Sequence, residues 1–416
     1  MRVAIVSFYT PPDPAVASHR VLRMTRALLG AGHEVHWVTL DERRLLRRDP
    51  SLASLIPAGV VRHGLGGPTL ASRPAARNLP ERVLRTLYHW LPDWFALPDK
   101  HVEWTCRLRR RLPSLAQEHQ FDAIVLTCGP HGQLMSIPRL RRAVPAAKLI
   151  VDYRDLLSGN PWTQSAGARV RRRLAGRERA MLSHADSLFV NSTQALQSFQ
   201  ATFGDLELPV SVMRNAADYA LADEVAARSL SSRPSAGVVL GYFGTIFPRR
   251  MLTPVFQALE QLPSETLSKI RVDVYCDAQD SKSLLERDLD CFRPEVAARV
   301  TRHDYLPYAE ALLAMRATSA LLLVNGSDPA DDVFVPGKLF DYVMARRPTL
   351  FVGGVGDARQ IVARTSGADC CFAHGDVDGL AAAIGRLVAG APDLNPVPEY
   401  DRDVTFAPLL ERLDAQ

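Results

Sequence analysis

The sequence predicts an α/β protein of two domains, each built on a parallel β-sheet with helices on both faces. The chain has 416 residues, a length that suits two domains of ordinary size. Short runs that are apolar at every position alternate with amphipathic helical patterns along almost the whole chain. Strands that are buried on both faces, with a helix between successive strands, are typical of doubly wound parallel sheets.

The first domain is expected from six strands and the helical patterns between them. The strands are predicted at 2–7, 34–39, 121–127, 147–153, 186–191 and 210–214, and the helices at 15–29, 101–119, 167–184 and 193–203. The stretch 216–236 then breaks the alternation, because it is small and polar and ends in Ser, Arg and Pro. We place the domain boundary there.

The same alternation restarts after the boundary. Strands are predicted at 238–243, 270–275, 320–324, 349–352 and 369–373, and helices at 252–261, 308–317, 337–345, 357–365 and 377–388. Asp376 is expected to cap the last of these helices. We therefore assign residues 1–218 to the first domain and 237–400 to the second, and expect residues 401–416 to pack back on the first.

Composition excludes several classes of protein. No uninterrupted apolar run reaches the roughly 18 residues that a membrane span needs, and the first apolar run is too short for a signal peptide. The six cysteines include no CxxC pair, which favours reduced, mostly buried thiols. We expect a cytoplasmic protein, either dissolved or peripheral on the inner face of the membrane.

Charge is divided unequally along the chain. Residues 1–215 hold 30 Lys and Arg against 17 Asp and Glu, although the whole chain carries only +5. Arginines gather at 107–111 and 169–179, and the stretch 79–95 adds Leu87, Trp90, Leu91, Trp94 and Phe95. One interpretation is that these residues bind an anionic membrane surface or a lipid-diphosphate acceptor. The alternative is that they form solvated helices on a core with buried tryptophans. No nucleic-acid-binding module is visible.

The segment 328–344 contains a predicted phosphate site. Pro336 and Gly337 open a helix whose first amides and positive dipole end attract a phosphate. Lys338 adds a full charge, and Asp341, one turn later, can accept hydrogen bonds from the two hydroxyls of a ribose. The alternative is an ordinary helix start with a solvated Lys–Asp pair.

A second segment, 241–251, follows a buried strand. Gly244 lets a ligand approach the backbone, and Arg249 and Arg250 can clamp a diphosphate. A solvated basic loop would have the same sequence.

Polar residues also end two strands of the first domain. His131 follows one of them and is a candidate base or contact for a sugar hydroxyl, although a lone histidine can also be structural. Asp152, Arg154 and Asp155 end the other. They either face the ligand site or form an internal salt bridge that ties loops together.

The loop that follows the first strand lacks the GxGxxG pattern, so dinucleotide binding in the ordinary manner is not expected. Ser18, His19 and Arg20 instead open the first helix toward the same edge of the sheet.

In order and spacing, these segments resemble glycosyltransferase family 4, whose GT-B fold has two Rossmann-like domains facing a central cleft. The similar segments include RVAIVSFYTPP, FDAIVLTCGPH, LIVDYRD, GYFGTIFPRR and VPGKLFDYVMARRPTLFV. The resemblance implies a retaining, hexosyltransferase-like enzyme without metal or cofactor. It would bind a nucleotide-diphosphate sugar on the second domain and a glycan, lipid-linked or small-molecule acceptor on the first.

The resemblance also assigns individual residues. Asp341 takes the place of the ribose-binding acid, and Lys338 is the lysine near the phosphates. Thr245 stands where an arginine usually follows the glycine, whereas Arg250 matches the second base of that motif.

The largest departure from the family is Val333, which replaces an acid eight residues before Asp341. Asp331 or Asp332 can serve in its place. If neither does, the chain is a divergent or inactive member.

The expected site follows from these assignments. The donor-binding residues are Gly244, Thr245, Arg249, Arg250, Asp332, Pro336, Gly337, Lys338, Leu339 and Asp341; the catalytic residues are His131, Arg250 and Lys338; the acceptor residues are Ser18, His19, Arg20, Asp152, Arg154 and Asp155. Cell-surface polysaccharide, lipopolysaccharide and glycolipid synthesis are the expected roles. A nucleotide-sugar 2-epimerase and a non-catalytic nucleotide-sugar-binding partner are the alternatives.

Overall fold

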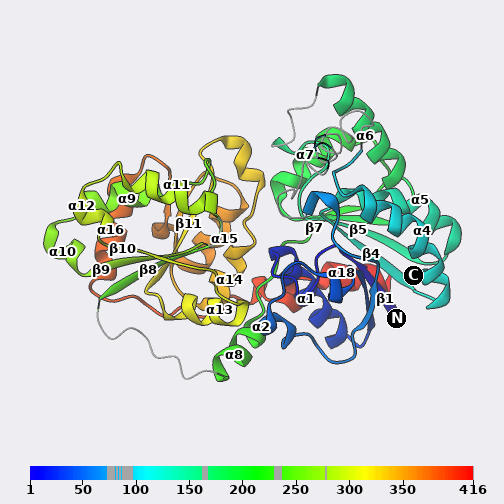
Figure 1. Cartoon of the computed structure of the whole chain (residues 1–416), viewed down its shortest axis with the longest axis horizontal. Coiled ribbons are helices and arrows are strands. Elements are labelled where there is room, and N and C mark those ends of the chain that lie inside the picture. The colour runs from blue at the N-terminus through cyan, green and yellow to red at the C-terminus, as the bar shows by residue number, and fades with distance from the viewer. Residues whose placement is uncertain are drawn as a thin grey trace. The chain divides into compact units, whose positions relative to one another are not determined.

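The computed structural model describes residues 1–72, 97–161, 167–228, 237–276 and 279–415, with positions 80, 83 and 86. The chain divides into two compact units (Figure 1). Unit 1 contains residues 1–215 and 405–416, and unit 2 contains residues 216–404. The stretch read as a boundary contains helix α8 (Tyr219–Ala227), which belongs to unit 2.

Unit 1 is built on a sheet of seven parallel strands in the order β3-β2-β1-β4-β5-β6-β7. The strands are β1 (Arg2–Val6), β2 (Glu34–Thr39), β3 (Val61–Gly64), β4 (Ala123–Cys128), β5 (Lys148–Tyr153), β6 (Ser187–Val190) and β7 (Val210–Val212). All six predicted strands are confirmed. The edge strand β3 was not predicted, because its sequence VRHG is polar and no residue of it is fully buried.

Helices cover both faces of this sheet (Figure 1). They are α1 (Val16–Gly30), α2 (Pro50–Ala53), α4 (Val102–Glu118), α5 (Ile137–Ala143), α6 (Ala168–Leu182), α7 (Thr193–Phe203) and α18 (Ala407–Asp414). The last of these belongs to unit 1 although it follows unit 2 in the chain. Lys148 Nζ of β5 donates to the carbonyls of Arg412 and Leu413, at 3.2 and 2.6 Å, and Phe406 is fully buried.

Unit 2 is built on six parallel strands in the order β10-β9-β8-β11-β12-β13. They are β8 (Val238–Phe243), β9 (Ile270–Tyr275), β10 (Val300–His303), β11 (Ala320–Val324), β12 (Thr349–Val352) and β13 (Cys371–Phe372). The predicted strands are confirmed, the last of them shortened by a 3-10 turn at Ala368–Cys370. The edge strand β10 was not predicted, because it too is polar and incompletely buried.

The described helices of unit 2 are α8, α9 (Thr253–Glu260), α10 (Ser264–Ser268), α11 (Gln279–Leu289), α12 (Pro294–Ala297), α13 (Tyr308–Ala317), α14 (Lys338–Ala345), α15 (Asp357–Ser366), α16 (Val377–Leu387) and α17 (Arg402–Thr405). They include five that the sequence did not predict, namely α8, α10, α11, α12 and α17. The Asp376 carboxylate accepts a hydrogen bond from the Gly379 amide at 3.1 Å and so caps α16, as predicted. Helix α14 begins one residue later than predicted, with Gly337 as its N-cap.

Strand order fixes where a ligand can bind in each unit. The order reverses between β1 and β4 in unit 1 and between β8 and β11 in unit 2. Doubly wound sheets bind ligands at the carboxyl ends of the strands beside such a reversal. The segments that leave these strands are therefore the first places to look for a site.

Two expectations from composition are addressed by the structure. None of the six cysteines forms a disulfide, and only Cys106 and Cys291 are exposed. Within the described ranges, no helix combines the length and the apolar character that a membrane span requires.

Candidate functional site

The predicted glycine loop and the predicted lysine of unit 2 lie side by side. Gly244 follows β8 with a φ of +114°, a conformation that favours glycine. A Cβ atom at this position would lie 3.8 Å from both Cδ and Nζ of Lys338, the first residue of α14. Two segments far apart in the sequence thus meet at the carboxyl end of β8.

The ammonium group of Lys338 lies over an aromatic ring. Nζ is 3.7 Å from the centroid of the Tyr242 ring, within cation–π range. Burial, with a smaller contribution from the charge of Arg250, lowers the pKa of Lys338 to about 7. A bound anion would favour the charged form and raise this pKa again.

The two arginines of the loop face the segment that precedes α14. Arg249 Nη1 lies 3.3 Å from Asp331 Oδ1, and the side chain of Arg249 remains 56% exposed whereas that of Asp331 is 1% exposed. The Arg250 guanidinium lies 5.8 Å from the centroid of the Phe334 ring. Lys338 therefore lies beside Gly244, whereas the two arginines lie against the segment that precedes α14.

The acids suggested as substitutes at Val333 are both engaged by the fold. Asp331 is buried beside Arg249. Asp332 accepts a hydrogen bond from the Val355 amide at 3.1 Å, and a Cβ at Gly354 would lie 2.2 Å from its Oδ1. Asp332 thus holds the loop that follows β12.

The start of α14 has the predicted character. Its N-cap, Gly337, supplies no side-chain hydrogen bond to the first amides. Pro336 and Gly337 are partly exposed, whereas Leu339 is fully buried and belongs to the hydrophobic core.

Asp341 lies in the first turn of α14 but is only 4% exposed. The Tyr308 hydroxyl donates to its Oδ1 at 3.0 Å. Thr245, the other residue assigned by resemblance, accepts a hydrogen bond at its carbonyl from the Tyr242 hydroxyl at 2.9 Å. Neither tyrosine contact could be predicted from the sequence, because both depend on tertiary packing.

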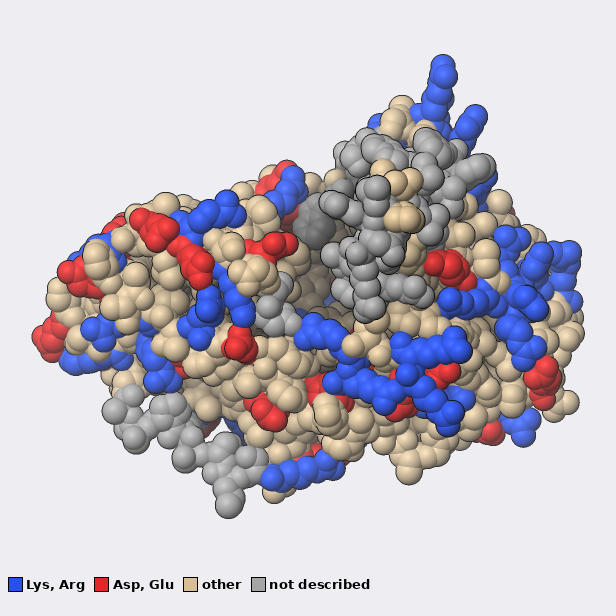
Figure 2. Space-filling view, viewed as in Figure 1, with Lys and Arg blue, Asp and Glu red and all other residues tan. Residues whose placement is uncertain are grey.

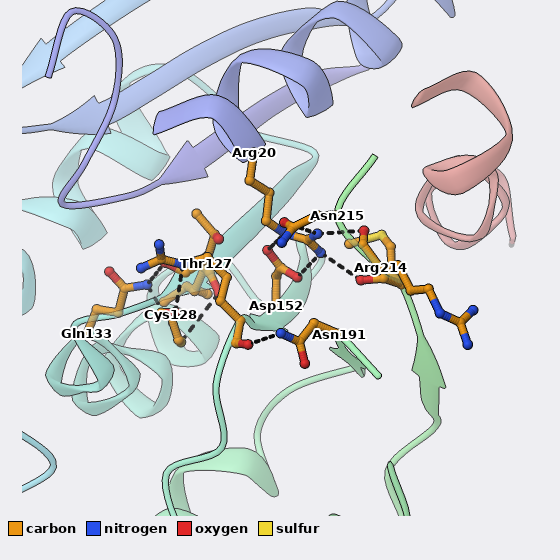
Figure 3. Close-up of polar contacts among 11 residues, drawn as sticks. Arg20, Thr127, Cys128, Gln133, Asp152, Asn191, Arg214 and Asn215 are labelled. Carbon is orange, nitrogen blue, oxygen red and sulfur yellow. Dashed lines mark hydrogen bonds and ion pairs between the residues drawn. The ribbon is translucent and has the colours of Figure 1, made fainter. Parts of the chain in front are cut away.

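In unit 1, Arg20 and Asp152 form a buried ion pair (Figure 3). Arg20 Nε and Nη2 donate to the two carboxylate oxygens of Asp152 at 2.9 and 2.6 Å. The remaining donors reach the carbonyls of Met213 and Arg214 and Oδ1 of Asn215, at 3.0, 2.7 and 3.1 Å. An arginine has five N–H donors, so the fold uses all of them. This is the internal salt bridge named above as an alternative.

Arg154 braces the turn after β4. Its Nε and Nη2 donate to the carbonyls of Cys128 and Gly129, at 3.1 and 2.6 Å. Gly129 has a φ of +130°, and a Cβ there would lie 2.2 Å from Nη2 of Arg154. The Asn191 side-chain amide donates to the Arg154 carbonyl, as Figure 3 shows.

His131 is held in one tautomer. Its Nε2 lies 2.8 Å from the carbonyl oxygen of Asp155. Because a carbonyl only accepts, the proton lies on Nε2 and the lone pair on Nδ1. Burial lowers the pKa of His131, so the ring is neutral at pH 7. A neutral imidazole with one acceptor nitrogen thus lies at the carboxyl end of β4.

The other predicted residues of unit 1 differ in how far they are exposed to solvent. Ser18 is fully buried, His19 is half-buried and Asp155 is exposed. Gln133 was not among the predicted residues. Its Nε2 donates to the Thr127 carbonyl at 2.7 Å. An amide side chain shortly after a buried strand was the available signal.

Most arginines of the second arginine-rich helix are exposed. Arg169, Arg171, Arg172, Arg173 and Arg177 of α6 are exposed. Lys and Arg side chains gather in patches in Figure 2, with Asp and Glu among them. The predicted interfacial residues Leu87, Trp90, Leu91, Trp94 and Phe95 lie outside the described residues.

Comparisons with known proteins bear on the family and the fold. Residues 17–215 match the family described as glycosyl transferase 4-like domain. No curated protein sequence matches the chain.

Several solved structures share the fold over the whole chain. A UDP-forming α,α-trehalose-phosphate synthase from Burkholderia xenovorans, in complex with glucose-6-phosphate, aligns over 100% of both chains with 14% identity and a TM-score of 0.67. The Anabaena protein HepE in complex with UDP aligns over 100% of both chains, with 15% identity and a TM-score of 0.62. A sucrose-phosphate synthase from Thermosynechococcus elongatus covers 99% of this chain and 94% of its own, with 15% identity and a TM-score of 0.58. At these identities the likeness shows the fold, which is GT-B.

Proposed function

We propose that this GT-B chain, of which residues 17–215 are a glycosyl transferase 4-like domain, transfers a sugar from a nucleotide-diphosphate sugar to an acceptor. The observation that carries the proposal is the basic cluster at the strand reversal of unit 2, where Lys338 lies beside Gly244 and the two arginines of the loop lie against the segment before α14. Diphosphate is the ligand that this group suits best, because it carries several negative charges on a narrow backbone.

In this proposal the diphosphate lies against the Gly244 backbone and the start of α14. Lys338 and Arg250 supply full charges, and the helix amides supply hydrogen bonds and the positive end of a dipole. When the bond to the sugar breaks, negative charge grows on the leaving phosphate. Fixed positive groups that face that charge lower the barrier.

Asp341 is the proposed ribose contact. Tyr308 fixes its carboxylate, so two vicinal hydroxyls of a ribose would meet an acceptor that is already oriented. Because Asp341 is buried, its carboxylate would meet only a ligand that reaches into unit 2.

Unit 1 is proposed to bind the acceptor. His131 would accept a hydrogen bond from a sugar hydroxyl at Nδ1 and so position the acceptor. Arg20, Asp152 and Arg154 would keep the strand-end segments in place, because their hydrogen bonds serve the fold. We further propose the retaining route, in which the leaving phosphate takes the acceptor proton and no metal or cofactor takes part.

The acceptors that we propose belong to cell-surface polysaccharide, lipopolysaccharide or glycolipid synthesis in the cytoplasm. The exposed arginines of α6 support an anionic lipid surface or lipid-diphosphate as a neighbour. A non-catalytic nucleotide-sugar-binding partner is the second candidate, because Val333 lacks a carboxylate and Asp331 and Asp332 are engaged by the fold.

Calorimetry with UDP, GDP, ADP and their sugars tests the donor site. We expect one nucleotide to bind tightly to the wild type and about 1–3 kcal/mol more weakly to Asp341→Asn, the usual range for a lost hydrogen bond to a charged group. Glu265→Gln is the control. This exposed acid of α10 directly precedes β9, so it lies toward the amino ends of the strands, away from the predicted site at their carboxyl ends.

Turnover separates the two candidate functions. Binding followed by release of nucleotide only when an acceptor is present supports the transferase, whereas binding without turnover on any acceptor supports the inactive partner. Release of a changed sugar without an acceptor would instead indicate an epimerase. If no nucleotide binds to either protein, the donor site is wrong.

A further inference from the structure

Three histidines from three separate elements meet in unit 1. They are His36 of β2, His63 of the edge strand β3, and His119, the C-cap of α4. One ring nitrogen from each can be chosen so that all three atoms lie within 4.8 Å of one another. Helix α4 ends where the chain enters β4, so the cluster lies toward the amino ends of the strands, away from the residues assigned to sugar transfer.

The spacing of the nitrogens suits a transition metal. His36 Nδ1 and His63 Nε2 are 3.0 Å apart. A tetrahedral zinc ion with Zn–N bonds of about 2.0–2.1 Å places its ligand nitrogens about 3.3–3.4 Å apart. The observed separation of 3.0 Å is close to that value and no pair of the chosen nitrogens is more than 4.8 Å apart, so side-chain rotations would close the site. Imidazole nitrogens are also ligands of nickel and copper.

A carboxylate orients one of the three rings. Glu34 Oε1 lies 2.8 Å from His36 Nε2, and Arg2 Nε holds the other carboxylate oxygen at 3.1 Å. A proton on Nε2 between His36 and Glu34 leaves the lone pair on Nδ1, the atom that faces His63. Metal-binding histidines very often donate their second ring nitrogen to a carboxylate in this way.

The three histidines differ in their exposure to solvent. His36 is 3% exposed, and Phe121 stacks on the His119 ring with a centroid distance of 5.7 Å. His63 and His119 are half-buried. The cluster is therefore shielded on its inner side and open on its outer side, where water can complete a fourth coordination position.

We propose that His36, His63 and His119 bind a divalent transition-metal ion, with Zn²⁺ the best match, at a site separate from sugar transfer. The ion would join the edge strand β3 to β2 and to the end of α4. This proposal does not depend on the proposed function, because it rests on residues that the transfer reaction does not use. Its competitor is a cluster of histidines held only by hydrogen bonds and stacking.

Titration of the chelator-treated full chain with ZnCl₂ by calorimetry tests the proposal. We expect one ion per chain. Removing a ligand in His119→Asn should weaken binding about a hundredfold, and Glu34→Gln should weaken it about tenfold. His184→Asn, which removes an exposed histidine of the same unit, should bind as the wild type does. Co²⁺ should give the visible absorption of a tetrahedral ion in the wild type and lose it in His119→Asn.

His119 is chosen because it follows a helix and is not part of the sheet, so the variant should fold. Tryptophan fluorescence checks this point, because every tryptophan of the chain lies before residue 216. If Zn²⁺ binds equally to the wild type and His119→Asn, or if His184→Asn weakens binding as much, the cluster is held only by packing and the proposal fails.

Discussion

The carboxyl ends of the two sheets carry similar charged side chains but use them differently. In unit 1, Arg20 and Asp152 are 2% and 0% exposed and the arginine has no donor left over. In unit 2, Arg249 remains 56% exposed beside its partner, and the Lys338 ammonium faces an aromatic ring. The charges of unit 1 therefore stabilise the fold, whereas those of unit 2 are placed where an anion can meet them.

The contrast between the two clusters shows how charged side chains at a strand end should be interpreted. Both clusters follow buried parallel strands and look alike in the sequence. What separates them is how many hydrogen bonds each side chain already makes within the fold. A donor that the fold has used is a poor candidate for a ligand contact, because a ligand would have to displace a buried partner.

The largest effect should come from breaking the ion pair of unit 1. Asp152→Asn leaves Arg20 buried with an incomplete set of partners, so we expect a loss of about 3–5 kcal/mol in the free energy of unfolding. Urea denaturation followed by tryptophan fluorescence reports on this unit. Asp205→Asn is the control, because this 75% exposed partner of Arg179 should contribute little to the free energy of unfolding. Equal losses in the two variants would mean that the buried pair has no special role.

Removing the lysine of unit 2 should impair activity and leave the fold intact. Lys338→Met takes away a positive charge that faces the leaving phosphate, so kcat should fall by about 10²–10³-fold, as for other transition-state donors. Transferase assays with the nucleotide sugar identified by calorimetry measure this. Lys269→Met, at an exposed lysine of the same unit, should keep wild-type activity. A Lys338→Met enzyme of full activity would remove this lysine from the mechanism.

Glu178 should make the stability of unit 1 depend on pH. Burial raises the pKa of Glu178 to about 7, although Tyr153 and Ser158 donate hydrogen bonds to it. A raised pKa favours folding at low pH. The contribution should therefore be complete below about pH 4.5 and be lost as pH rises through 7, by up to about 3 kcal/mol. Urea denaturation across this range should show a steeper fall in the free energy of unfolding in the wild type than in Glu178→Gln.

In unit 2 the corresponding pH effect should appear in binding. The Lys338 ammonium has a pKa of about 7, so the charged form that attracts a diphosphate is lost as pH rises above 7. We expect the affinity for a nucleotide sugar to fall by up to about tenfold per pH unit there, because one proton must be taken up on binding. Calorimetry in two buffers of different ionisation enthalpy counts that proton. Lys338→Met should bind weakly at every pH, and a persisting pH dependence in that variant would assign the effect to another group.

The smallest effect is expected at His131. Loss of one hydrogen bond to an acceptor hydroxyl costs about 0.5–1.5 kcal/mol, so His131→Asn should raise the KM for the acceptor by about 3–10-fold with little change in kcat. Initial rates at varied acceptor concentration separate the two constants. A fall in kcat of a hundredfold or more would instead indicate that His131 moves a proton in the reaction.

The sequence predicted the fold well where burial is complete. Strand β8 reads VVLGYF and is buried at every position, whereas the edge strands β3 and β10 present polar residues and could not be distinguished from loops. Pro336 placed the start of α14 to within one residue because the proline restricts its own backbone and that of Val335.

The sites were predicted less completely, because a sequence pattern does not count hydrogen bonds. Arg20 appeared to face a ligand, but its partners come from β5 and from the segment after β7. Tyr308 reaches Asp341 from another helix, and no local spacing indicates that contact. The three histidines of the proposed metal site are likewise far apart in the sequence and were not singled out.

The return of the chain to unit 1 bears on the order in which the protein is made. Residues 405–416 complete unit 1, yet a ribosome synthesises them after every residue of unit 2. Lys148 of β5 must therefore wait for its acceptor carbonyls on Arg412 and Leu413 until unit 2 has been synthesised. Domains usually fold in the order of their synthesis. Here the unit that begins first should be the last to mature on the ribosome.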